Sequence, residues 1–292
     1  MSDLSDVVRP PAVAGIFYPE DPRECAEQVD GLLAQASARL VDEGWKSAPK
    51  AIIVPHAGWH WSGDLGALAW QTLAPRRRTI SRVVVLGPTH RVAIRGVALP
   101  AATVFRTPLG DLPVPVQQVL SQTADLPCPV HVDTATHAHE HALEVQVPFI
   151  QRVLGDVELV PLNVGQASPG EVADIIEALW GSHETVVAIS TDLSHYHDGA
   201  TARRLDADTV RAISMSGDRE GGRVEEAAVI PSDRACGASP LNGLLEVCAR
   251  RGLRPTLLGA HNSGDVPGGE DTRVVGYAAF AVEEDNHDTS TT

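Results

Sequence analysis

The 292-residue chain is poor in basic residues, in cysteine and in long apolar runs. It carries 23 Lys and Arg against 38 Asp and Glu, which gives a formal net charge of −15. Lys and Arg supply the sequence-independent part of binding to nucleic acids and anionic membranes, so this charge argues against both partners. No apolar run approaches the ~20 residues that cross a bilayer. The first residues lack a basic segment followed by an apolar one, so no secretory signal is predicted.

The four cysteines (Cys25, Cys128, Cys236 and Cys248) have no paired spacing. In a chain without an export signal they are expected to be thiols, which indicates a cytoplasmic protein. The Walker pattern, GxGxxG after a strand and the GxSxG nucleophile elbow are all absent. Nucleotide binding and this type of serine hydrolase are therefore not supported.

Short β-branched runs alternate with longer segments of helical period, and 43% of the residues are hydrophobic. This pattern predicts a single α/β domain with a largely parallel mixed sheet flanked by helices. Residues 91–140, rich in Pro and His, are expected to be an insertion of short strands and loops. Strands are predicted at 51–55, 82–87, 157–164, 184–190, 254–260 and 273–282. Helices are predicted at 23–40, 64–73, 141–154, 169–180, 200–215 and 239–251.

Three predicted strands run directly into a turn that carries histidine. AIIVP leads to His56, VVVLG leads to His90 and VVAIS leads to His195. The carboxyl ends of parallel strands share one edge of a sheet, so these histidines converge if the strands are neighbours. Imidazole is a common metal ligand and titrates near neutrality, which leaves a metal site and an acid/base site both open.

Cys236 is the fourth candidate. It precedes a predicted helix that Ser239 is expected to cap, and the helix start and Arg234 are expected to lower the pKa of the thiol. Thiolate is a strong ligand for zinc, iron and copper. The alternative for a lone cysteine is a small buried hydrophobe, and that interpretation suits Cys248 on the apolar face of the same helix.

The densest polar cluster is HAHEHALEVQ, residues 137–146. Glu140 and Glu144 stand four residues apart, which predicts two carboxylates on one helical face. With His141 they are expected to orient ligand histidines from behind; capping of the helix start is the alternative. Asp192, three residues before His195, is expected to orient that imidazole or to bind substrate, as beside a general base.

Seven segments resemble, in the same order, motifs of the Memo family, whose bacterial and archaeal members are called AmmeMemoRadiSam system protein B. The resemblance covers residues 8–282, and residues 283–292 are expected to be a disordered acidic tail. The segments are RPPAVAGIFYP (9–19), PHAGWHWSG (55–63), GPTH (87–90), EHALEVQVPF (140–149), STDLSHY (190–196), ACG (235–237) and SGDVPGGEDTRVVGYAAF (263–280).

The resemblance implies a fold similar to class III extradiol dioxygenases, which are single-domain α/β enzymes with non-haem iron. It assigns His56, His90 and Cys236 as metal ligands, and His195 as the acid/base with Asp192 beside it. In this chain a thiolate replaces the carboxylate of the dioxygenase site, so ring cleavage of catechols does not follow.

Three functions remain open at this point. The first is a redox enzyme that uses Fe(II), or copper, on a small organic substrate in a pathway that the family name links to a radical-SAM protein. The second is a non-catalytic metal-binding effector, and the third is a zinc hydrolase with an open fourth coordination position. Exposed edge strands are compatible with a homodimer, but no residue pattern decides it.

Overall fold

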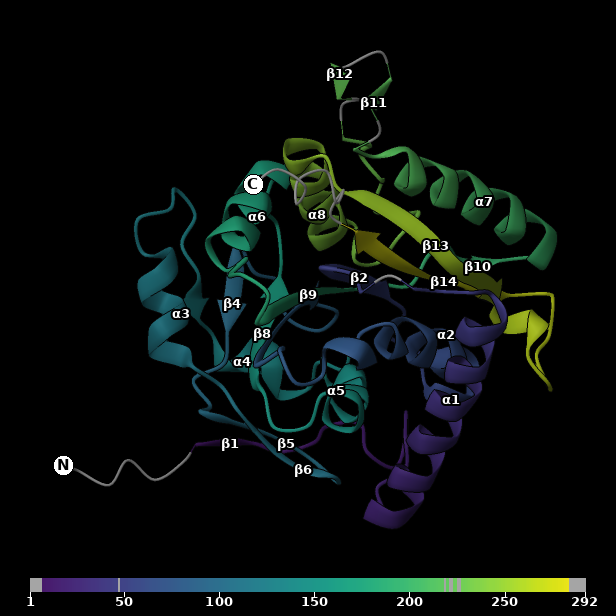
Figure 1. The fold of residues 1–292 in the computed structure, drawn as a ribbon, viewed down its shortest axis with the longest axis horizontal. Coiled ribbons are helices and arrows are strands. Elements are labelled where there is room, and N and C mark those ends of the chain that lie inside the picture. The colour runs from purple at the N-terminus through teal and green to yellow at the C-terminus, as the bar shows by residue number, and fades with distance from the viewer. Residues whose placement is uncertain (1–6, 47, 218, 221–222, 225–226, 284–292) are drawn as a thin grey trace, which may run out of the picture.

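The chain folds around a central sheet whose middle strands are parallel (Figure 1). The computed structural model describes residues 7–46, 48–217, 219–220, 223–224 and 227–283. Within these residues the strand order is β10-β14-β2-β9-β3-β8-β4-β7, and β13 pairs with β14. The strands are β2 (Ala51–Val54), β3 (Arg82–Pro88), β4 (Val97–Leu99), β7 (His131–Val132), β8 (Glu158–Val164), β9 (Thr185–Ser190), β10 (His195–His197), β13 (Arg254–Asn262) and β14 (Val274–Glu283).

The sheet is mixed. β2, β9, β3 and β8 pair in parallel, whereas β14 pairs antiparallel with β2, and β4 pairs antiparallel with β8. β13 and β14 are antiparallel because the connection between them, residues 263–273, is too short for a crossover. All six predicted strands are present, and the predicted α/β fold with a mixed sheet is confirmed. Its continuous parallel part is limited to the four central strands.

Helices cover both faces of this sheet (Figure 1). One layer contains α1 (Pro22–Asp42), α2 (Trp59–Gln71) and α5 (Val147–Val153), and the other contains α6 (Pro169–Ala178), α7 (Gly199–Met215) and α8 (Ala238–Arg251). The predicted starts of two helices are confirmed. The Asp21 side chain accepts from the first turn of α1, and Ser168 and Glu171 form a capping box on α6.

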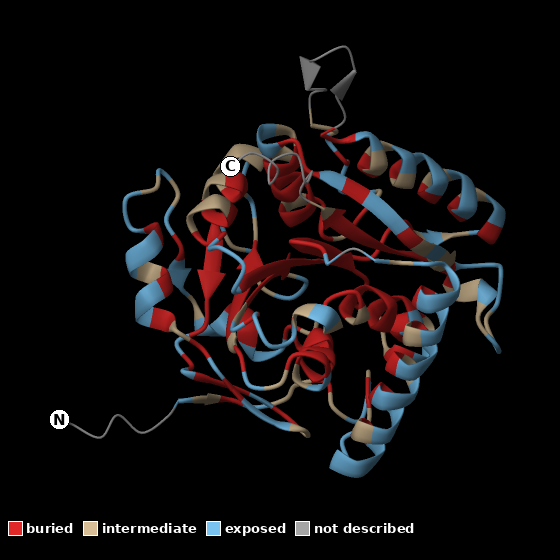
Figure 2. Ribbon diagram, in the orientation of Figure 1, coloured by how far each residue is buried: buried red, intermediate tan, exposed pale blue. Residues whose placement is uncertain are grey.

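The two helical layers bury the central strands, which appear red in Figure 2. β2 and β9 are buried at every residue, as the continuous apolar runs of doubly covered parallel strands require. None of the helices in the described ranges is both long and apolar enough to cross a membrane.

Two predicted helices begin elsewhere. The predicted helix 64–73 is α2, which begins at Trp59. The predicted helix 141–154 starts only at Val147, after a 3-10 turn, η2 (Glu144–Gln146). Pro148, which has no backbone N–H to donate, sits in the first turn of α5 and suits a helix start there. Glu140 therefore precedes the helix, and the prediction that Glu140 and Glu144 share one helical face is wrong.

The insertion contains two short helices as well as the expected strands. α3 (Val116–Thr123) precedes β7 and α4 (Thr134–Ala138) follows it, and β5 (Val104–Thr107) pairs with the N-terminal β1 (Val8–Arg9). The predicted tail, 283–292, lies outside the described residues except for Glu283, which ends β14. The remaining elements are β1 (Val8–Arg9), β5 (Val104–Thr107), β6 (Gly110–Pro113), β11 (Arg219–Glu220), β12 (Arg223–Val224), η1 (Ala74–Arg76) and η3 (Ser263–Asp265).

Candidate metal centre and adjoining pocket

Three neighbouring parallel strands deliver the predicted histidines to one edge of the sheet. β9 lies between β2 and β3, with Val54 opposite Ser190 and Leu86 opposite Ile189. The strands therefore end close together, and His56 and His90 each follow the end of their strand by two residues. The predicted adjacency of these strands is confirmed.

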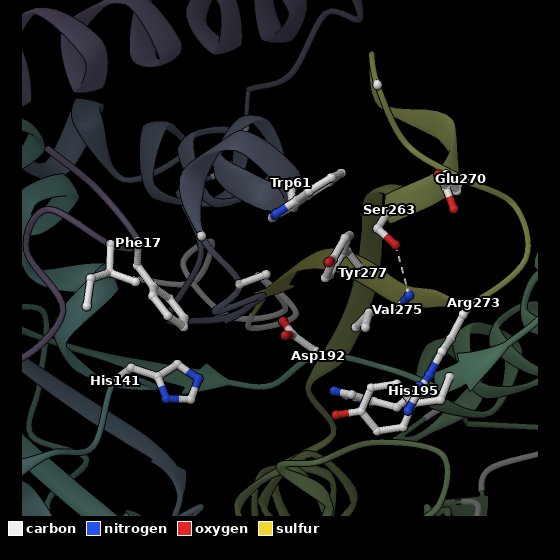
Figure 3. Close-up of a pocket in the computed structure, with 15 residues that line it drawn as sticks. Phe17, Trp61, His141, Asp192, His195, Ser263, Glu270, Arg273, Val275 and Tyr277 are labelled. Atoms are coloured by element: carbon white, nitrogen blue, oxygen red, sulfur yellow. Dashed lines mark hydrogen bonds between the residues drawn. The ribbon is translucent and has the colours of Figure 1, made fainter.

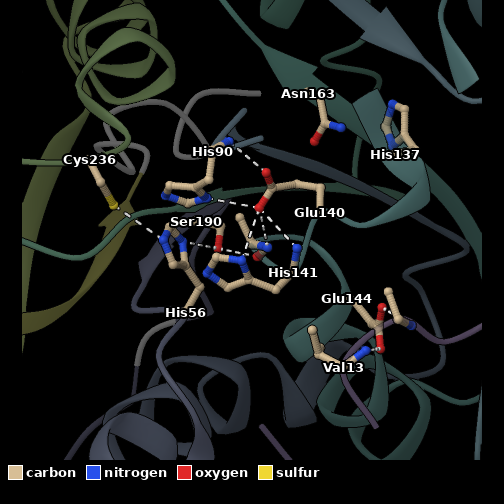
Figure 4. A network of polar contacts seen from close by, with 12 residues as sticks. Val13, His56, His90, His137, Glu140, His141, Glu144, Asn163, Ser190 and Cys236 are labelled. Carbon is tan, nitrogen blue, oxygen red and sulfur yellow. Dashed lines mark hydrogen bonds and ion pairs between the residues drawn. The ribbon is translucent and has the colours of Figure 1, made fainter. Parts of the chain in front are cut away.

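His56, His90 and Cys236, called here the His–Cys cluster, lie together at this edge (Figure 4). Cys236 enters from the turn before α8, and its Sγ lies 3.2 Å from Nε2 of His56. One donor atom from each residue lies within 4.8 Å of the other two. Metal–ligand bonds of about 2.0–2.3 Å place tetrahedral donor atoms roughly 3–4 Å apart, so small movements would suit a shared ion.

Hydrogen bonds fix which nitrogen of each imidazole faces the cluster. Ser190 Oγ donates to the Ala142 carbonyl at 2.6 Å, so it accepts from His56 Nδ1 at 3.0 Å. His90 Nδ1 lies 2.8 Å from a Glu140 carboxylate oxygen and donates to it. Both Nε2 atoms therefore keep a lone pair for a ligand. Burial and the nearby histidines hold the pKa of His56 well below its usual range, so its imidazole is neutral.

Glu140 forms hydrogen bonds to His90 on the side away from the cluster. Its two oxygens accept from the His90 ring, the His90 backbone and the backbone N–H groups of His141 and Ala142. Burial alone would raise the pKa of this carboxyl, but the hydrogen bonds that it accepts, above all from the His90 ring, hold it at about 2. His90, Glu140 and His141 also form a possible ligand group. The donors already bound to both Glu140 oxygens make Glu140 a support for His90 rather than a ligand.

Glu144 points away from the histidines, toward the N-terminal segment (Figure 4). It forms a buried ion pair with Arg9 and accepts from the backbone N–H groups of Ala12 and Val13 and from the Tyr18 hydroxyl. The prediction that Glu144 orients a ligand histidine is therefore wrong. Its hydrogen bonds instead hold residues 9–18 against the rest of the domain.

His141 lies closer to the cluster than its predicted supporting role implied. Its ring centroid is 4.7 Å from that of His90 and 5.3 Å from that of His56. Burial lowers the pKa of His141 to about 4, so it is neutral at physiological pH. It packs against Phe17 and lines the pocket described below.

The predicted surroundings of Cys236 are wrong in two respects. Arg234 donates to the Leu205 carbonyl, and burial raises the pKa of the Cys236 thiol to about 12 in the metal-free protein. Ser239 does not cap α8, because its hydroxyl donates to the Ala167 carbonyl. Cys248 is fully buried among apolar side chains, as predicted.

The Asp192 carboxylate forms a hydrogen bond with the backbone of His56 and does not orient the His195 imidazole. One carboxylate oxygen accepts from the His56 backbone N–H at 2.7 Å, and its own N–H donates to Cys236 Sγ at 3.3 Å. Burial raises the pKa of Asp192 to about 7, although the hydrogen bond from the His56 backbone acts in the opposite direction. His195 is oriented by the Leu193 carbonyl, 2.8 Å from its Nδ1. The predicted pairing of Asp192 with His195 is therefore wrong, although both line the same pocket.

That pocket, called here the aromatic pocket, has a volume of about 620 Å³ (Figure 3). Its aromatic walls are Phe17, Trp61, Tyr196 and Tyr277, and its polar groups include His141, Asp192, His195, Glu270 and Arg273.

Tyr196 and Arg273 form one edge of the aromatic pocket. Tyr196 has φ of 66°, and among the described residues it is the non-glycine residue with positive φ. The Arg273 guanidinium stacks on the Tyr196 ring at 4.4 Å and forms no ion pair within the described part of the chain. Backbone strain of this kind concentrates at ligand sites. Neither residue is marked by a sequence motif of its own, although Tyr196 directly follows His195.

The fold and the His–Cys cluster define an α/β protein with a candidate metal centre at the carboxyl edge of a parallel sheet. The sequence model of the Memo-like protein family matches residues 9–281. A MEMO1 family protein of Aeropyrum pernix is 32% identical over 287 residues, which cover 94% of this chain and 99% of the relative. One from Methanopyrus kandleri is 33% identical and covers 93% of this chain and 98% of its own length.

The chain therefore belongs to the Memo-like family, and the resemblance seen in its motifs is confirmed. Among solved structures, an uncharacterized protein from Escherichia coli K12 aligns with 77% of this chain and 98% of its own chain. The TM-score is 0.46 and the sequence identity is 15%.

Proposed function

We propose that this protein is a metal-dependent redox enzyme in which His56, His90 and Cys236 bind Fe(II). The observation that carries the proposal is the orientation of the donors. Nδ1 of each histidine is held by a hydrogen bond, which leaves Nε2 facing the cluster beside Cys236 Sγ. Two imidazoles and one thiolate suit iron, copper and zinc, so the residues fit such an ion. Once bound, the ion would act as a Lewis acid and redox centre.

His195 supplies the proton-transfer group of the aromatic pocket, and Asp192 lines the same pocket. His195 donates through Nδ1 to Leu193, so its Nε2 is the basic atom, and burial lowers its pKa and keeps it neutral. Asp192, with a pKa of about 7, is able to exist in either protonation state near neutral pH. We assign His195 as the base that accepts a substrate proton and Asp192 as the group that holds the His56 backbone in place.

The aromatic pocket suits a planar organic substrate. Phe17, Trp61 and Tyr277 offer flat apolar surfaces, and Arg273 offers a guanidinium restrained by stacking on Tyr196. A carboxylate or a comparable anionic group on the substrate would pair with Arg273. The aromatic walls would exclude water from the reacting end of the substrate.

The first experiment is metal analysis of protein purified without oxygen. We expect near-stoichiometric iron in the wild type, loss of the iron in Cys236→Ser and retention in the matched control Cys128→Ser, whose thiol lies outside the cluster. Zinc in place of iron would redirect the assignment to hydrolysis. The absence of retained metal after reconstitution would refute the metal site.

The second experiment separates an enzyme from a non-catalytic metal-binding effector. Oxygen consumption with phenolic substrates is measured for the wild type and for His195→Ala. We expect His195→Ala to retain metal and to lose turnover. A metal-loaded His195→Ala protein with full activity would refute the assigned base, and a metal-loaded wild type inert to every substrate tested would favour the effector.

A further inference from the structure

We propose that a second pocket admits a small anion to the metal beside His90 and Cys236, separately from the substrate in the aromatic pocket. This inference rests on the proposed function, because it uses the same His–Cys cluster. The second pocket has a volume of about 500 Å³ and shares no lining residue with the aromatic pocket.

The His–Cys cluster lies between the two pockets. His90 and Cys236 line the second pocket, whereas His141, Asp192 and His195 line the aromatic pocket. A ligand in the second pocket would therefore reach the donor atoms without passing the aromatic walls. Two ligands that enter by different routes would meet at one ion.

The walls of the second pocket are held together by backbone hydrogen bonds. They come from the end of β3 and the turn after it (88–94), from the end of β8 and the turn after it (164–166), and from Ser232, Cys236 and residues 238–240 before and within α8. Gln166 donates to the Ile94 carbonyl at 2.9 Å, and Gly96 donates to the Gln166 carbonyl at 2.9 Å. A Cβ at Gly165 would lie 2.2 Å from the Ile94 carbonyl oxygen, so only glycine allows this close approach. The pocket is therefore largely preformed.

The charge of the second pocket favours an anion. Its lining includes Arg91 and contains no Asp or Glu, although the whole chain has a net charge of −15. Arg91 is exposed and forms no ion pair with any residue that the structure describes. The hydroxyl of Ser232 adds a hydrogen-bond donor. The aromatic pocket, by contrast, includes the carboxyl groups of Asp192 and Glu270.

The route is tested by alkylation of Cys236 in the metal-free protein, followed by peptide mass spectrometry. Ser239→Trp fills the second pocket, and Ser263→Trp makes the same change in the aromatic pocket. With iodoacetamide, we expect Ser239→Trp to slow Cys236 modification about tenfold and Ser263→Trp to change it less than about twofold. Slowing by Ser263→Trp alone, or by neither variant, would overturn the proposed route. Ala93→Trp, at an exposed position of the second pocket, repeats the test with less risk to folding.

The preference for an anion is tested with two reagents of similar size. Iodoacetate is anionic and iodoacetamide is neutral, so the ratio of their rates at Cys236, divided by the ratio for a peptide thiol, reports the charge of the route. We expect Arg91→Ala to lower this normalised ratio at least about threefold. Arg77→Ala, which removes an arginine outside both pockets, is the control for net charge. An unchanged ratio in Arg91→Ala would overturn the assignment of an anion.

Azide binding to the cobalt-loaded protein is the final measurement. Cobalt(II) reports added ligands in its visible absorption, and azide serves as the small anion. We expect Ser239→Trp to weaken azide binding about tenfold and Ser263→Trp to leave it unchanged. Failure to hold cobalt would count against the proposed metal site. If the protein binds cobalt but Ser239→Trp does not change its affinity for azide, only the proposed anion route through the second pocket would be overturned.

Discussion

Replacement of Glu140 by Gln isolates the contribution of the hydrogen bonds behind His90. One Glu140 oxygen accepts from the His90 backbone N–H, and the other accepts from the His90 ring, His141 and Ala142. A Gln side chain keeps one acceptor oxygen and turns an NH₂ group toward a backbone or ring donor. It also removes the negative charge that makes the His90 imidazole a stronger base.

Loss of a carboxylate behind a metal-ligating histidine weakens binding by about 10- to 100-fold, or about 1.4–2.7 kcal/mol. We expect Glu140→Gln to fall in this range. The assay is an anaerobic competition titration against a chromophoric chelator, with folding checked by circular dichroism.

Glu144→Gln is the matched control. It makes the same isosteric change four residues away, at a carboxylate that is equally buried but bound to the N-terminal segment. We expect its metal affinity to stay within about threefold of the wild type. Wild-type affinity in Glu140→Gln, or equal losses in both variants, would refute the argument that Glu140 acts through His90.

Three further predictions follow from single groups. Because the Cys236 thiol is protonated below its pKa of about 12, metal binding releases its proton, and the apparent affinity should rise about tenfold per pH unit near neutrality; an apparent affinity that does not change with pH in this range would contradict it. Glu144→Gln should lower the free energy of unfolding by about 3 kcal/mol, because Arg9 stays buried without its charge partner; an unchanged denaturant midpoint would disprove this. Arg273→Ala should weaken benzoate binding about tenfold by calorimetry and leave benzamide unchanged; equal effects on both ligands would rule out charge pairing.

The sheet was predictable because its signals are local. Runs such as AIIV in β2 and TVVAIS in β9 are buried on both faces, and burial selects the same apolar residues that the sequence displays. The starts of α1 and α6 were equally local, since Asp21 and Ser168 satisfy backbone donors two or three residues away. The start of α5 was missed because residues 140–143 follow the hydrogen bonds of a buried carboxylate, which periodicity does not report.

The approach of His56 and His90 was predictable from topology alone, since each follows one of the parallel strands of the same sheet. The walls of the two pockets were not predictable in this way. Phe17 reaches the aromatic pocket because Glu144 holds the N-terminal segment, and Arg273 reaches it from the loop before β14. These contacts join residues more than 70 positions apart, as in the stacking of Arg273 on Tyr196, and no local pattern marks them.

The charges around the His–Cys cluster affect which ligand the second pocket admits. A divalent ion bound by the Cys236 thiolate, with the Glu140 carboxylate behind His90, leaves a centre with no net formal charge. An anion arriving beside Cys236 would then add a buried negative charge, which is costly unless a proton accompanies it. Arg91, the arginine in the lining of the second pocket, would offset part of that cost. An anion that enters by this route would therefore depend on Arg91, which the comparison of iodoacetate with iodoacetamide tests directly.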